Sequence, residues 1–161
     1  MTVIIGIDPG IGKTGWAIIE RLGRGAKAIN LLASGLIKTD TTAASAVRLR
    51  TIHDQLQLAI NEYGAEQAAI EDSFVNKNPR SSLKLSQARG AIILSLNLAG
   101  LSVAEYTPTA VKSAIVGSGR ADKAEVARML TYLITIPTGK PLASDVSDAL
   151  GVAIAHSRLS E

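Results

Sequence analysis

Cysteine is absent from this 161-residue sequence, and aromatic residues make up only 3% of it. Without cysteine there can be no disulfide, no thiolate zinc site and no cysteine nucleophile, so any metal must be held by oxygen or imidazole ligands. Hydrophobic residues reach 47% of the chain, but none of their runs approaches membrane-spanning length. The N-terminus lacks the basic segment and cleavage site of a signal peptide, so we expect a cytoplasmic protein with no membrane segment.

Positive charge is modest in amount, with a formal net charge of +3, but it is clustered. One basic group follows a polar loop, and a second surrounds a glycine-rich turn. Their members are Lys77, Arg80, Lys84 and Arg89, then Lys112, Arg120, Lys123 and Arg128. Two such groups beside acid-bearing segments suit a polyanion such as nucleic acid, although ordinary solubility is the simpler explanation of the total charge.

Apolar periodicity and turn residues predict one α/β domain over residues 1–161. We expect strands at 3–8, 16–20, 29–39, 67–71 and 102–106, and helices at 44–63, 83–98, 110–116, 122–133 and 144–158. Glycine-containing turns join the first three strands, which indicates an antiparallel meander. Helices and strands then alternate, as expected for a five-stranded mixed sheet flanked by helices, in the element order of the ribonuclease H-like fold.

The segment GIDPGIGKTG, Gly6–Gly15, superficially resembles a phosphate-binding loop. The pattern G-x-x-x-x-G-K-[ST] would require glycine where Ile7 stands. Asp8 would repel phosphate, and the proline after it removes an N–H donor. We therefore interpret the glycines, including Gly10 and Gly15, as a tight turn that leaves Asp8 unobstructed.

Four carboxylates are spaced in a way that predicts a shared site. Asp8 and Glu71 each end an apolar strand, while Asp145 and Asp148 lie three residues apart on one face of the last helix. Each acid alone has an ordinary explanation, as a turn residue, a strand-end acid or a first-turn acid. Together they predict an oxygen-only site for Mg²⁺ or Mn²⁺, and two such ions support phosphodiester hydrolysis.

Four motifs, "IIGIDPGIGKTGWAII", "AAIEDSF", "NKNPRSSLKLSQARGA" and "SDVSDALGVAIAH", together resemble the RuvC family of crossover junction endodeoxyribonucleases over nearly the whole chain. The resemblance implies a single nuclease domain that resolves four-way (Holliday) DNA junctions by symmetric Mg²⁺-dependent hydrolysis in recombination and repair. It also implies that Asp8, Glu71, Asp145 and Asp148 are the catalytic and metal-binding residues. Some relatives carry His in place of Asp145. Asp72 follows Glu71 directly, and we expect it to point away from the site.

The resemblance further implies DNA contacts around the site. Phe74, the only phenylalanine, would stack on an unpaired base at the branch point, whereas the alternative is a hydrophobic plug for its loop. The candidate DNA-binding residues are Lys13, Phe74, Asn76, Lys77, Asn78, Arg80, Lys84, Lys112 and Lys123. Solvated lysines on helix faces are an equally good explanation for Lys112 and Lys123.

Symmetric cleavage on two strands requires two active sites, so a homodimer is implied, and a branch-migration motor could assist it. We expect the interface on the helix at 83–98, where Ala88, Gly90 and Ala91 permit close approach; the alternative is a helix simply buried in the core. We expect His53 at the surface and His156 in a structural or supporting role. Competing functions are an ATP-binding module of the actin and sugar-kinase type, and a catalytically silent or RNA-processing relative of the same fold.

Overall fold

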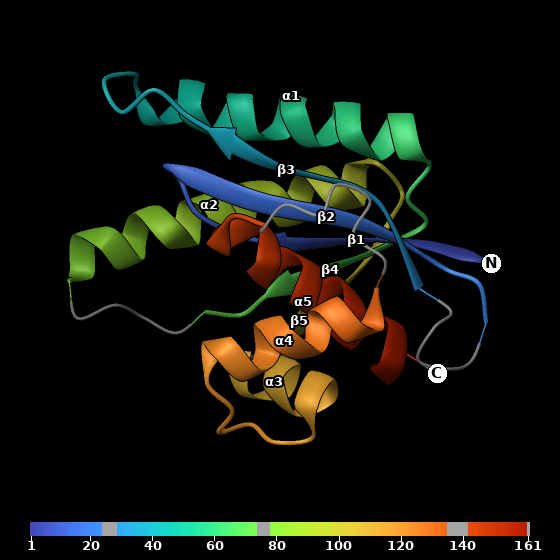
Figure 1. Cartoon of the computed structure of the whole chain (residues 1–161). Helices are drawn as coiled ribbons and strands as arrows, with labels where there is room; N and C mark the ends of the chain where they lie inside the picture. Colours follow the sequence, from blue (N-terminus) through green and yellow to red (C-terminus); the bar gives the residue numbers. More distant parts are fainter. Residues whose placement is uncertain (24–28, 74–77, 135–141, 161) are drawn as a thin grey trace.

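A computed structural model describes residues 1–23, 29–73, 78–134 and 142–160 (Figure 1). It contains a five-stranded sheet in the order β3-β2-β1-β4-β5. The strands are β1 (Thr2–Asp8), β2 (Lys13–Arg21), β3 (Ile29–Lys38), β4 (Gln67–Glu71) and β5 (Ser102–Tyr106). β1, β2 and β3 pair antiparallel, whereas β1, β4 and β5 pair parallel, which confirms the predicted meander and mixed sheet.

Helices cover both faces of the sheet (Figure 1). On one face lie α1 (Ser45–Tyr63) and α2 (Pro79–Leu98); on the other lie α3 (Pro108–Val116), α4 (Lys123–Leu133) and α5 (Ser144–Leu159). Successive strand residues face opposite layers, so Ile5 packs into the α1–α2 core and Ile4 into the α3–α5 core. Within the described segments, no helix is long and apolar enough to cross a membrane.

Polar caps set helix starts that hydrophobic spacing does not reveal. α2 begins at Pro79, four residues before its predicted start, because the Asn78 side chain accepts hydrogen bonds from the backbone N–H groups of Arg80 and Ser81. α4 begins with a capping box between Asp122 and Glu125.

Two glycines allow α5 to lie directly on the sheet. A Cβ at Gly15 would lie 2.1 Å from the backbone oxygen of Asp145, and a Cβ at Gly6 would lie 2.3 Å from that of Ala149. The role predicted for Gly15, a turn residue, is therefore wrong, because helix packing requires that glycine. The turn itself requires Gly10, whose Cβ would meet the backbone oxygen of Lys13 at 2.3 Å.

Candidate active site

Asp8 and Glu71 lie at the same edge of the sheet. β1 and β4 are parallel neighbours with Ile7 opposite Ile70, so the two acids that follow also lie side by side. The first turns of α5 approach this edge, because Gly15 at the start of β2 touches the backbone of Asp145. In Figure 1 the ends of β1 and β4 and the start of α5 point to the same side of the molecule.

The pKa of the Asp8 carboxyl shows most clearly that the acids lie close together. This pKa is raised to about 7, chiefly because burial removes the carboxyl from water and then because of the negative charges of Glu71, Asp148 and Asp145. Asp8 also shares a side-chain hydrogen bond with Glu71, which favours the protonated form of Asp8. The four predicted acids therefore interact as one group, hereafter the carboxylate cluster.

Glu71 is perturbed in the same direction. Burial raises the pKa of its carboxyl, opposed by a hydrogen bond that the Ser73 hydroxyl donates to Oε2 at 3.1 Å. The negative charge of Asp148 raises that pKa further. Two neighbouring acids thus both favour proton uptake, as expected for carboxyls that are partly removed from water and lie beside like charges.

Lys123 supplies a positive charge beside the carboxylate cluster. Its Nζ lies 3.3 Å from Oδ2 of Asp148, and this carboxylate is the main cause of the raised pKa of the Lys123 ammonium. The Lys123 side chain is 78% exposed, so the pair is a weak, solvent-screened contact. The cluster consequently keeps most of its negative charge.

The side chains do not form a preassembled metal site. In the part of the chain that the structure describes, no three Asp, Glu or His residues are arranged to hold one ion. The chemistry of the donor set nevertheless fits a hard divalent cation, because all four groups are carboxylates and Asp8 retains a proton at unusually high pH. Displacement of that proton by a cation would relieve the same repulsion.

A cavity of about 500 Å³ opens beside the carboxylate cluster. Its charged lining residues are Glu71, Asp148, Lys112 and Lys123, and the remainder are Leu142 and uncharged residues of α3, α4 and α5. Lys112 and Lys123, predicted from separate helices, therefore lie on one cavity with two of the acids.

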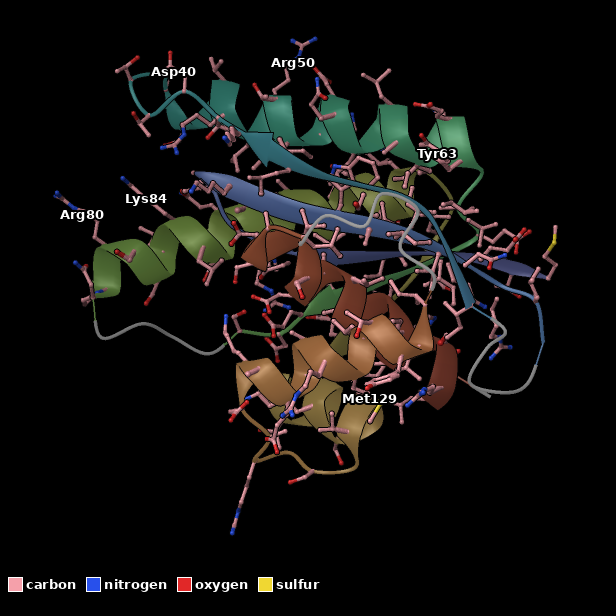
Figure 2. The ribbon with its side chains drawn as sticks, viewed as in Figure 1. Asp40, Arg50, Tyr63, Arg80, Lys84 and Met129 are labelled. Carbon is pink, nitrogen blue, oxygen red and sulfur yellow. The ribbon has the colours of Figure 1, made fainter. Side chains whose placement is uncertain are left out.

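Other predicted DNA-binding residues lie at the same end of the molecule. Arg80 and Lys84 project from the exposed start of α2, as Figure 2 shows. Lys13 is exposed at the start of β2, a strand position that no phosphate-binding loop would give it. The Asn78 carboxamide oxygen is occupied as the α2 cap. Phe74, Asn76 and Lys77 lie outside the described residues.

Arg89 has a role that the sequence did not reveal. It belongs to one of the predicted basic groups, yet its guanidinium donates to Asp72 at 2.6 Å and also to Glu105. The Arg89 side chain is only 16% exposed, so its charge is neutralised within the protein. Asp72 accordingly points away from the carboxylate cluster, as predicted.

The two histidines lie in different environments. His156 is buried and hydrogen-bonded to the Tyr106 hydroxyl at 2.9 Å and to Gln67 at 3.1 Å, which confirms the structural interpretation. The surface prediction for His53 is wrong, because this side chain is half-buried and its Nδ1 lies 2.8 Å from the Ser95 hydroxyl, linking α1 to α2.

Comparison of the sequence with known proteins identifies a family and several relatives. The model of the family described as crossover junction endodeoxyribonuclease RuvC matches residues 4–156. A protein of that name from Cupriavidus taiwanensis is 48% identical over 154 residues, covering 96% of this chain and 82% of the relative. The counterpart from Azorhizobium caulinodans is 43% identical over 157 residues, covering 98% and 90% of the two chains.

Solved structures of related proteins have the same fold as this chain. RuvC of Thermus thermophilus superposes with a TM-score of 0.90 at 31% identity, covering 99% of this chain and 95% of that one. The same protein in complex with a Holliday junction substrate gives a TM-score of 0.91 at 30% identity over the same coverage. A yeast mitochondrial Holliday junction resolvase, at 10% identity and a TM-score of 0.64, shares the fold. The ribonuclease H-like prediction is thereby confirmed.

Proposed function

The chain belongs to the RuvC family of crossover junction endodeoxyribonucleases, and from this premise we propose that it resolves four-way DNA junctions by metal-dependent hydrolysis of two phosphodiester bonds. Junction resolution follows from the family and from the relative that was solved with a Holliday junction. The proposed hydrolysis is supported mainly by the interaction of Asp8 with three other carboxylates, beside a cavity that two lysines flank.

Asp8, Glu71, Asp145 and Asp148 would hold Mg²⁺, or Mn²⁺ in its place, in a site for two ions. Bound there, the two ions would activate water and stabilise the leaving oxygen of the phosphodiester. The protein's own contribution is a set of half-buried carboxylates, only one of which contacts a lysine in the described part of the chain, and their removal from water together with their mutual repulsion favours cation binding, as the raised pKa of Asp8 indicates.

The lysines and arginines around the carboxylate cluster would contact the sugar–phosphate backbone. Lys112 and Lys123 flank the cavity, so they are suited to the strand that is cut. Arg80, Lys84 and Lys13 are exposed at the same end and are suited to the junction arms. We retain Phe74, Asn76, Lys77 and Asn78 as proposed junction contacts, on the strength of the family motif that they belong to.

A symmetric dimer would present two sites to one junction, and the outer face of α2 is the proposed interface. Leu83, Leu94 and Leu98 are 61%, 58% and 69% exposed on this helix, and Gly90 lies on the same side with nothing within 4 Å of its Cβ position. Ala88, in contrast, is fully buried and belongs to the core. The helix thus combines both predicted roles, a core face and an outward apolar face. We propose a branch-migration motor as a further partner.

Cleavage of a labelled four-way junction tests this function. We expect paired nicks in Mg²⁺ or Mn²⁺, little cutting of a linear duplex of the same sequence, and no cutting in excess chelator. The Asp8→Asn and Glu71→Gln variants should bind the junction yet fail to cut it, whereas Asp54→Asn, an exposed acid on α1, should cut normally. Equal cutting of linear duplex would contradict junction selectivity.

The competing functions make different predictions in parallel assays. An ATP-binding module would bind labelled ATP with micromolar affinity, and an RNA-processing relative would cut structured RNA in preference to DNA junctions. The start of β2 at Lys13 leaves no helix N-terminus after the glycine-rich turn, so it offers no support for nucleotide binding.

A further inference from the structure

The cavity beside the carboxylate cluster has two kinds of wall. Its charged members are Glu71, Asp148, Lys112 and Lys123. Its apolar wall is formed by Pro108, Val111, Val126, Ala127, Leu142 and Gly151, which belong mainly to α3, α4 and α5. Hydrolysis of a phosphodiester by carboxylate-bound metal does not itself require an apolar wall. This part of the cavity therefore needs another explanation.

Small residues line the cavity where the helices meet. Ala127 is exposed on α4, so it contributes surface to the cavity without filling it. Gly151 on α5 is closely backed, because a Cβ there would lie 3.2 Å from Cδ1 of Ile115. Val111, at 7% exposure, belongs both to the core and to the cavity lining. The apolar wall is thus a continuation of the packed α3–α5 core, against which Val126 and Leu142 also pack.

The size and polarity of the cavity match one nucleotide. Its volume of about 500 Å³ lies in the range of about 300 to 1,000 Å³ typical of small-molecule sites, too small for a duplex arm. A nucleobase has apolar faces and polar edges, which the apolar wall and the hydroxyls of Ser144 and Ser147 complement. The attached phosphate would then lie toward Lys112 and Lys123, next to the acids.

We propose that this cavity receives one unstacked nucleobase adjacent to the phosphodiester that is cut. The proposal rests on the junction-cleaving function above and adds a base-binding subsite to it. In a linear duplex, removing a base from the stack costs a few kcal/mol, whereas a base at a branch point is already partly unstacked. The subsite would therefore make cleavage depend on junction structure and on the base next to the cut.

The decisive experiment fills the cavity from its exposed wall. Ala127→Phe places a ring over the apolar side, and Ala124→Phe adds the same ring on an exposed position of α4 outside the lining. Loss of roughly 60 Å² of buried base surface corresponds to about a tenfold effect, so we expect Ala127→Phe to slow junction cleavage at least tenfold. Its junction affinity should fall by no more than the same factor, and Ala124→Phe should match wild type in both.

Base entry is measured separately with 2-aminopurine, whose fluorescence rises when it leaves a base stack. The probe is placed in turn on each side of the cleavage position, and binding is measured in the Asp8→Asn background so that no cutting occurs. Because the lining contains no aromatic residue among the described positions, fluorescence should rise at one of these positions. The rise should be lost when Ala127→Leu is added, a variant that fills the cavity without supplying a ring that would itself quench the probe.

Three outcomes would overturn the subsite: equal cleavage by Ala127→Phe and Ala124→Phe, an unchanged fluorescence at every position, or a rise that Ala127→Leu does not prevent. Wild-type cleavage of the junction is the internal reference in all of these assays. If the wild type cuts and the variants behave alike, the subsite fails while the proposed function stands. If the wild type does not cut four-way junctions, the proposed function fails first.

Discussion

Removing the charge of Asp8 should stabilise the metal-free protein at neutral and higher pH. The pKa of this carboxyl rises from 3.8 to about 7 on folding, so the folded protein binds the proton more tightly than the unfolded chain. The stabilising proton is fully present below about pH 4, and the penalty for ionisation grows as pH rises toward 7. A shift of about 3 units corresponds to at most about 4 kcal/mol.

Asp8→Asn removes this penalty while keeping the shape of the side chain and a donor for Glu71. In chelator at pH 8 we expect the free energy of unfolding of the variant to exceed that of wild type by about 1 to 4 kcal/mol. This difference corresponds to several degrees in melting temperature. At pH 4 the two proteins should differ little. Thermal melts of wild type, Asp8→Asn and Asp54→Asn across this range provide the assay, and the exposed Asp54 should change stability by less than about 0.5 kcal/mol.

Addition of Mg²⁺ should change the order of stability. An ion that binds only the folded wild type raises its melting temperature by mass action, whereas Asp8→Asn has lost a ligand and should respond less. The reasoning is refuted if Asp8→Asn melts below wild type in chelator at pH 8, or if the difference between them does not shrink toward pH 4. Equal Mg²⁺ shifts in both proteins would show that Asp8 does not bind the ion.

Three further predictions concern packing and charge. Gly15→Ala should lower the free energy of unfolding in urea by about 2 to 4 kcal/mol, since its Cβ would lie 2.1 Å from a backbone oxygen of α5, whereas the open Gly23→Ala should have little effect. Arg89→Met should lower melting temperature by leaving two carboxylates unpaired, and adding Asp72→Asn should recover part of that loss. Arg80→Ala should reduce the slope of log junction affinity against log salt by about one, and an unchanged slope would exclude Arg80 as a phosphate contact.

The sequence predicted most of the fold because local and long-range signals agree. β4 and β5 have the predicted bounds, since short apolar runs between polar turns leave little choice of register. Gly64 ends α1 in a left-handed conformation, as a glycine after an amphipathic helix suggests. The start of α2 was predicted too late, because a capping asparagine and a proline carry no hydrophobic periodicity.

Contacts between distant segments were harder to predict. Sequence spacing indicated that Asp8 and Glu71 converge, because both end strands, but it could not show that Arg89 is neutralised by Asp72 and Glu105. Nor could it distinguish Gly15 as a helix contact from Gly10 as a turn residue. The cavity wall was not predicted either, since ordinary apolar helix residues come to line one cavity only through the packing of three helices.

The parallel pairing of β1 with β4 also affects when the carboxylate cluster is assembled during folding. Ile7 pairs with Ile70 across a long stretch of sequence, and α5 adds its acids from near the other end. Contacts this distant carry a large loop-closure cost and slow folding, because closure must be completed before they contribute stability. We therefore expect partly folded chains to lack nuclease activity. In refolding experiments, junction cutting should return only together with the native fold, and DNA would be protected from the protein until folding is complete.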